Sequence, residues 1–234
     1  MNSHVPASLA TLALVALTTL PHSATLPLTP GVFPSNARPY GQSYAEWSAS
    51  WWTFCMEHPV VGHPFLDDGQ FDVTTGQSGN VWFLAAPFGT HTRTVTIPRG
   101  TALCVGLLNA EWSSLEPVSV APPTYSSDPA VLEAIATSTA DFITNVTCTL
   151  DGVGVDNIDD YRVVSPQFSF TAPDPWIFSA PDVLTGPGTA VADGYFVILR
   201  PLSVGQHVLH YSGEFDFGGG ALFPLDMTYT INVQ

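Results

Sequence analysis

Eight short segments rich in valine, threonine and aromatic residues recur along the chain, and glycine, proline or aspartate bounds each of them. They span residues 81–84, 90–97, 101–108, 146–150, 163–170, 194–199, 206–211 and 227–233. Short segments of this kind, joined by turn residues, are typical of the strands of an antiparallel sandwich. The pattern predicts an all-β, mainly antiparallel fold, namely a jelly-roll-like β-sandwich with one or two inserted helices.

Two helical patterns interrupt these segments. Ser43-Tyr-Ala-Glu46 is a capping-box sequence, in which a serine side chain and a glutamate carboxylate accept hydrogen bonds from free backbone amides at a helix start. It predicts a helix from Ser43 to Glu57, which His58-Pro59 ends. A second pattern follows Ser127-Asp128-Pro129, an N-cap with proline in the first turn. Helices inserted in this way, without regular alternation, argue against a doubly wound parallel sheet.

The amino terminus predicts export. Residues 9–20 form an apolar run of 12 residues, LATLALVALTTL. A membrane-spanning helix needs about 20 such residues, whereas a run of this size matches the core of a signal peptide. We therefore expect a signal peptide at 1–24, an extended proline-rich leader at 25–41 and a single β-sandwich domain at 42–234. The protein is predicted to be secreted, either extracellular or periplasmic, with no membrane span in the mature chain.

The charge balance excludes several functions. The chain has 20 acidic residues, five arginines and no lysine, which gives a net charge of −15. Without lysine there is no Schiff-base lysine and no Walker-type phosphate loop. Five scattered arginines form no basic stripe for a phosphate backbone, so we expect no nucleic-acid partner. The excess of carboxylates keeps an exported domain soluble and requires no cationic partner.

Three cysteines, Cys55, Cys104 and Cys148, lack the spacing of zinc or redox motifs. In an oxidising compartment the simplest interpretation is one disulfide and one buried thiol. Cys104 and Cys148 are candidates for the bridge, but each also lies in an apolar segment as a small core residue would. Their pairing stays open from the sequence.

Six stretches occur in an order that resembles a family of secreted bacterial β-rich proteins of uncharacterised activity. They are YAEWSASWW at 44–52, GQSGNVWFL at 76–84, RTVTIPRGTALCVGLLNA at 93–110, LDGV at 150–153, YRVVSP at 161–166 and DGYFVILRPLSVGQHVLHYSG at 193–213. Together they span residues 44–213 of the predicted mature chain. The resemblance implies export and a β-rich domain, and it supplies no activity.

Tryptophans and carboxylates indicate a glycan site. Tryptophan faces stack on sugar rings, and two suitably spaced carboxylates cleave glycosidic bonds. Asn109 and Glu111 follow an apolar strand and, by strand alternation, point to the same side. We expect Glu111 as the acid or base and Asp67 as its partner carboxylate. The expected substrate-binding residues are Asn109, Trp112, Trp82 and Gln77.

The leading hypothesis is thus a secreted protein that binds an extracellular glycan or small molecule. If the protein is an enzyme, this hypothesis makes it a carboxylate-dependent glycan hydrolase or lyase. One alternative is a non-catalytic cell-surface or assembly module, in which the tryptophans only stabilise the fold. Another is an exported metal-binding protein, with His58, His63 and Asp67 converging from one loop. For cofactors, we consider calcium at Asp156, Asp159 and Asp160, because carboxylates suit this ion.

Overall fold

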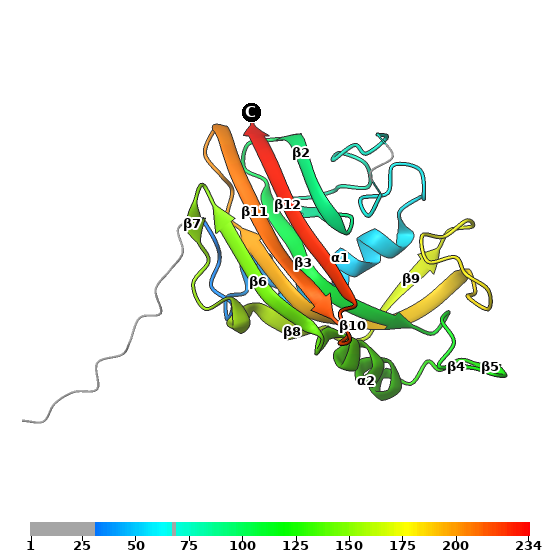
Figure 1. Ribbon diagram of the computed structural model, residues 1–234. Helices are drawn as coiled ribbons and strands as arrows, with labels where there is room; N and C mark the ends of the chain where they lie inside the picture. Colours follow the sequence, from blue (N-terminus) through cyan, green and yellow to red (C-terminus); the bar gives the residue numbers. More distant parts are fainter. Residues whose placement is uncertain (1–30, 67–68) are drawn as a thin grey trace, which may run out of the picture.

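The computed structural model describes residues 31–66 and 69–234 (Figure 1). The predicted signal peptide at 1–24, the first part of the predicted leader and Asp67 lie outside the described residues. The described part of the leader is attached to the domain. Val32 is buried and forms a β-bridge with Leu199, and the Tyr44 hydroxyl donates to the Phe33 carbonyl over 2.7 Å.

Strands dominate the described chain, and most of them form two five-stranded sheets. Sheet A has the order β1-β3-β10-β8, with β9 also paired to β10. Its strands are β1 (Val81–Leu84), β3 (Ala102–Ser113), β8 (Arg162–Val164), β9 (Phe168–Ala172) and β10 (Gly186–Leu199). Its pairs are antiparallel except for β1 with β3, which is parallel. Sheet A is therefore mixed.

Sheet B has the order β2-β12-β11-β6-β7. Its strands are β2 (Gly89–Ile97), β6 (Ile143–Leu150), β7 (Val153–Gly154), β11 (Gly205–Asp216) and β12 (Leu222–Val233). The β2–β12 pair is parallel and the others are antiparallel. A small ladder joins β4 (Ser119–Val120) to β5 (Pro123–Thr124). The described chain is thus mostly β, as predicted, but both sheets are mixed.

The two sheets share one hydrophobic core, and their strands lie in two layers (Figure 1). Along β12, alternate residues from Leu225 to Val233 are buried, which is the two-residue period of a strand with one face in the core. By contrast, every residue from Ala102 to Leu108 on β3 is buried. Because successive side chains of a strand point to opposite faces, this part of β3 is covered on both sides.

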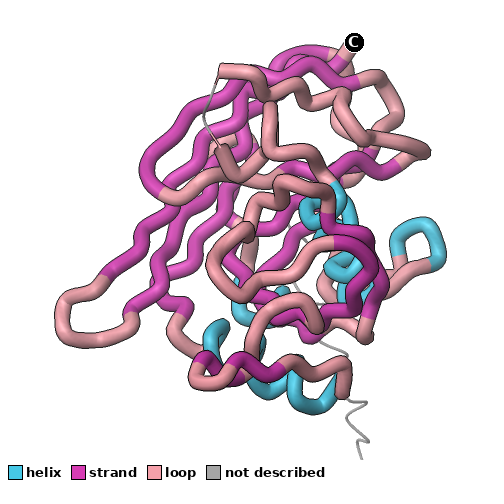
Figure 2. The backbone as a smooth tube through the Cα atoms, turned by 90° about the vertical axis from the view of Figure 1, so that its right-hand side faces the viewer, coloured by secondary structure: helices cyan, strands magenta, loops and turns pink. Residues whose placement is uncertain are grey.

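Helix α1 (Tyr44–Glu57) begins with the predicted capping box: the Ser43 Oγ accepts from the Glu46 amide, and the Glu46 carboxylate accepts from the Ser43 amide over 2.7 Å. The helix packs against sheet A, where the Trp51 ring rests on Gly106. A Cβ at Gly106 would lie 2.5 Å from that ring. Trp51 Nε1 also donates to the Leu84 carbonyl, which fixes α1 beside β1. Figure 2 shows the helices, in cyan, lying against the strands, in magenta.

Helix α2 (Pro129–Ala140) starts at Asp128, whose carboxylate accepts from the Ala130 amide. It packs on β3 and β10. Two 3-10 helices, η1 (Pro39–Gly41) and η2 (Ile158–Tyr161), complete the regular elements. None of the helices in the described part of the chain is long and apolar enough to span a membrane.

Most observed strands are longer than predicted, and two of the differences change how the strands pair. The segment predicted as one strand at 163–170 is split into β8 and β9. Pro166 lies in the break, where its missing N–H cannot serve a ladder. Strand β10 begins at Gly186, eight residues before the predicted start, because its first part pairs with β9.

The predicted disulfide is wrong. Cys55 on α1, Cys104 on β3 and Cys148 on β6 are all free thiols and all buried. Cys104 and Cys148 belong to different sheets, each within the core. Burial raises the pKa of all three thiols, that of Cys148 to about 12, so none of them is a reactive thiolate at neutral pH.

Candidate functional site

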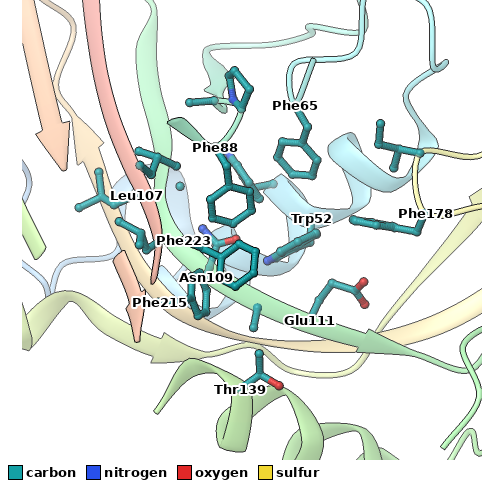
Figure 3. Close-up of a pocket in the computed structure, with 18 of the residues that line it drawn as sticks. Trp52, Phe65, Phe88, Leu107, Asn109, Glu111, Thr139, Phe178, Phe215 and Phe223 are labelled. Atoms are coloured by element: carbon teal, nitrogen blue, oxygen red, sulfur yellow. The ribbon is translucent and has the colours of Figure 1, made fainter. Parts of the chain in front are cut away.

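A cavity of about 520 Å³ lies where α1, β3 and one end of sheet B meet (Figure 3). Its described lining is mostly apolar, and eight of the lining residues are aromatic. These are Trp51, Trp52, Phe65, Phe88, Phe178, Phe215, Phe217 and Phe223. They come from α1, β11, β12, the loop between β11 and β12, and the loops around residues 65, 88 and 178. The cavity is therefore assembled from segments far apart in the sequence.

The aromatic rings form two groups. Trp52, Phe65 and Phe178 pack with ring centroids 5.9 to 6.3 Å apart, and they form one wall. Phe88 packs against Phe215 on the other side, with centroids 6.0 Å apart.

Phe88, Phe217 and Phe223 line the cavity and are also exposed to solvent, Phe88 by 57%. The cavity therefore opens to solvent beside these three rings. Phe217 and Phe223 are held together at this opening by an edge-to-face contact with centroids 5.6 Å apart.

A pair of carboxyl groups lies in the otherwise apolar lining. Glu111, on β3, and Glu116, in the turn that follows β3, are hydrogen-bonded to each other. Glu116 Oε2 also accepts from the Ser113 amide over 3.0 Å and from the Ser113 hydroxyl over 2.7 Å. These bonds favour ionised Glu116, and protonated Glu111 donates to it.

Burial raises the pKa of both groups, and the pKa of Glu111 lies well above its ordinary value because the adjacent Glu116 adds to the cost of a second charge. The pair therefore retains a proton at a pH where exposed glutamates have lost theirs.

Two buried polar atoms of the lining residues have no hydrogen-bond partner among the described residues. They are Glu111 Oε2, an acceptor, and Trp52 Nε1, a donor. A buried polar atom without a partner costs about 1–3 kcal/mol. A ligand that offered a donor to Glu111 and an acceptor to Trp52 would remove this cost.

The structure brings two of the sequence-predicted site residues together. Asn109 and Glu111 both line the cavity, as alternation along the strand predicts. The predicted partner carboxylate, Asp67, lies outside the described residues. Glu116 takes the place next to Glu111 that the sequence analysis gave to Asp67.

Trp82, Trp112 and Gln77 are not among the residues that line the cavity. The Gln77 amide is occupied by the backbone, because it accepts from the Phe83 N–H and donates to the Phe83 carbonyl, each over 2.8 Å. Trp82 is half-buried and packs against the core from β1. Gln77 and Trp82 thus serve the fold around β1, and Trp112 lies on β3 outside the described cavity lining.

The two histidines of the proposed metal site are both buried, with ring centroids 5.5 Å apart. His63 Nδ1 accepts from the Phe65 amide over 3.0 Å, so its Nε2 carries the proton and donates to the Cys55 carbonyl over 2.9 Å. Burial lowers the pKa of His58, and it lowers that of His63 to about 4. His63 has no free nitrogen for a metal, so the predicted ligand set of His58, His63 and Asp67 does not form in this geometry.

The predicted calcium ligands also fail to converge. Asp156 lies in the loop before η2, whereas Asp159 and Asp160 lie on η2. In the described ranges, 31–66 and 69–234, no three His, Cys, Asp or Glu side chains gather closely enough to hold a metal ion.

Several residues of the cavity were missed by the sequence analysis. Glu116 lies only five residues after Glu111, but its position in a turn gave no sign that it would fold back onto that side chain. The phenylalanines of β11, β12 and the loops carried no motif, and only the packing of the sheets reveals their role.

Comparisons with family models, with curated proteins and with solved structures give no match for this chain. The family resemblance seen in the sequence motifs therefore stays a prediction. The geometry of the cavity is the basis for assigning a function.

Proposed function

We propose that the protein is an exported, jelly-roll-like sandwich that binds an apolar small molecule in the aromatic cavity. The supporting observation is a cavity of about 520 Å³ with eight aromatic residues in its described lining. Ligand sites are concave and mostly apolar, with a few polar groups that fix the ligand's orientation. The Glu111–Glu116 pair and Trp52 Nε1 are such groups in this cavity.

The size and lining of the cavity set the expected affinity. A ligand that buried about 200 Å² of apolar surface would gain about 5 kcal/mol. Part of this gain is offset by the lost freedom of the bound ligand. The expected dissociation constants for simple probes therefore lie at about 0.2 mM or above.

Glycan binding, the hypothesis drawn from the sequence, is less well supported by this geometry. A sugar needs hydrogen-bond partners for many hydroxyl groups, and the polar side chains in the described lining, apart from the indoles, are Asn109, Glu111, Glu116 and Thr139. Glycosidase carboxylates stand about 5 to 9.5 Å apart with the scissile bond between them. Glu111 and Glu116 hydrogen-bond directly, which leaves no space for that bond.

The test is binding of N-phenyl-1-naphthylamine, a neutral probe whose fluorescence rises in apolar surroundings. Thr139 lines the cavity, so Thr139→Trp fills part of it and is expected to weaken probe binding at least about tenfold. Ser138→Trp is the matched control, because Ser138 is exposed and both hydroxyls donate to the Ile135 carbonyl. The proposal is wrong if the wild-type protein leaves the probe fluorescence unchanged, or if both variants bind it equally well.

A further inference from the structure

The cavity contains two acidic groups and no basic one. Glu111 and Glu116 are the ionisable side chains in its described lining, which includes no arginine or histidine. An anionic ligand would therefore meet two carboxyl groups without a compensating cation. A purely hydrocarbon ligand would leave Glu111 Oε2 without a partner.

The unpartnered atom defines what a ligand must offer. Glu111 shares its proton with Glu116, and its buried Oε2 accepts no hydrogen bond from any other described residue. The ligand group at this position must therefore be a hydrogen-bond donor. Ammonium, hydroxyl and amide groups are donors, and they differ in charge.

Charge favours the ammonium group among these donors. With one shared proton the glutamate pair carries one negative charge, and one ammonium group neutralises it. Hydrogen bonds between charged partners are about twice as strong as those between neutral ones. Trp52 and Phe178 line the same cavity with ring centroids 6.3 Å apart, and aromatic faces attract cations (Figure 3).

We propose that the Glu111–Glu116 pair is the recognition site for an ammonium group, and that the ligand class is an amine with an apolar body. This inference rests on the proposed function, since the aromatic cavity holds the apolar body. It adds the polar end of the ligand, which the apolar lining leaves undefined. Amine binding leaves the proton shared by the two glutamates in place and breaks no covalent bond.

The experiment compares three probes with the same eight-carbon chain: octylamine, octan-1-ol and octanoate. Calorimetric titration of the full-length protein at pH 7 measures each affinity, and displacement of N-phenyl-1-naphthylamine checks that the probes share its site. We expect octylamine to bind at least about tenfold more tightly than octan-1-ol, and octanoate to bind most weakly.

Glu116→Gln keeps the shape of the side chain and removes the negative charge of the pair, because Glu116 is its ionised member. We expect octylamine to bind this variant about as weakly as octan-1-ol does, with the octan-1-ol affinity unchanged. Glu133→Gln is the matched control, because Glu133 is exposed on α2 and is not part of the cavity lining. Thermal unfolding checks that both variants fold. If Glu116→Gln does not fold, the probe series on the wild-type protein still tests the proposal.

The outcomes separate the two proposals. If octan-1-ol displaces the fluorescent probe as well as octylamine does, the ammonium site is wrong and the apolar cavity stands. The same conclusion follows if Glu116→Gln keeps the preference for octylamine. If neither the fluorescent probe nor any of the three compounds binds, both the proposed function and the ammonium site are wrong.

Discussion

Gly194 on β10 lies against the backbone of β3 at the residue that leads into the cavity. A Cβ at Gly194 would lie 2.3 Å from both Cα and Cβ of Asn109, and 2.6 Å from the Leu108 carbonyl oxygen. Carbon atoms in contact lie about 3.5–4.0 Å apart, so Gly194→Ala requires β3 and β10 to separate locally by more than about 1 Å. The register of β10 also shifts between Gly194 and Phe196.

The cost follows from what must move. Overpacking a core costs about 1–3 kcal/mol when flexible side chains can give way, and sometimes more. At Gly194 the new Cβ would clash with the backbone of β3, which is hydrogen-bonded to β10 and cannot change rotamer as a side chain can. We therefore expect Gly194→Ala to lower the free energy of unfolding by about 3 kcal/mol or more. For a domain of this size that corresponds to a fall in Tm of about 6–12 °C.

Gly205→Ala is the control for backbone strain. Gly205 also has a large positive φ, +136° against +153° at Gly194, but a Cβ there has no atom within 4 Å. It should cost about 1 kcal/mol, from backbone strain alone. Urea unfolding followed by tryptophan fluorescence measures both variants. Unfolding free energies within about 0.5 kcal/mol of each other would refute the steric argument. Gly194→Ala should also weaken probe binding, because Asn109 lines the cavity.

Two further predictions concern stability. The pKa of Glu111 is raised by burial, so its contribution to stability is fully present below the ordinary glutamate pKa and is lost as pH rises through the folded-state pKa. Tm of the wild-type protein should therefore fall as pH rises above about 4.5, and Glu111→Gln should make this fall less steep. Glu133→Gln is the control. If Tm falls as steeply in Glu111→Gln as in Glu133→Gln, Glu111 does not retain a buried proton. Ser43→Ala removes the cap of α1 and should lower the free energy of unfolding by about 1 kcal/mol in urea titrations. No loss of stability would show that the capping box contributes little here.

Local chemistry in the sequence determined most of the secondary structure. The capping box at Ser43 predicted where α1 begins, because the bonds that satisfy the first amides of a helix lie within four residues. The segment at 227–233, rich in residues that favour strands, predicted the strand that the structure shows as part of β12. Strand alternation placed Asn109 and Glu111 on one side of β3.

Tertiary structure alone decided the site. Glu111 meets Glu116 because the turn after β3 folds back, and the aromatic wall forms because α1 and the loop around Phe178 pack together. The parallel pairs and the separate positions of Cys104 and Cys148 likewise depend on which strands become neighbours. Contacts between residues far apart in the chain depend on how all the helices and strands together bury their apolar faces. No local sequence pattern contains that information.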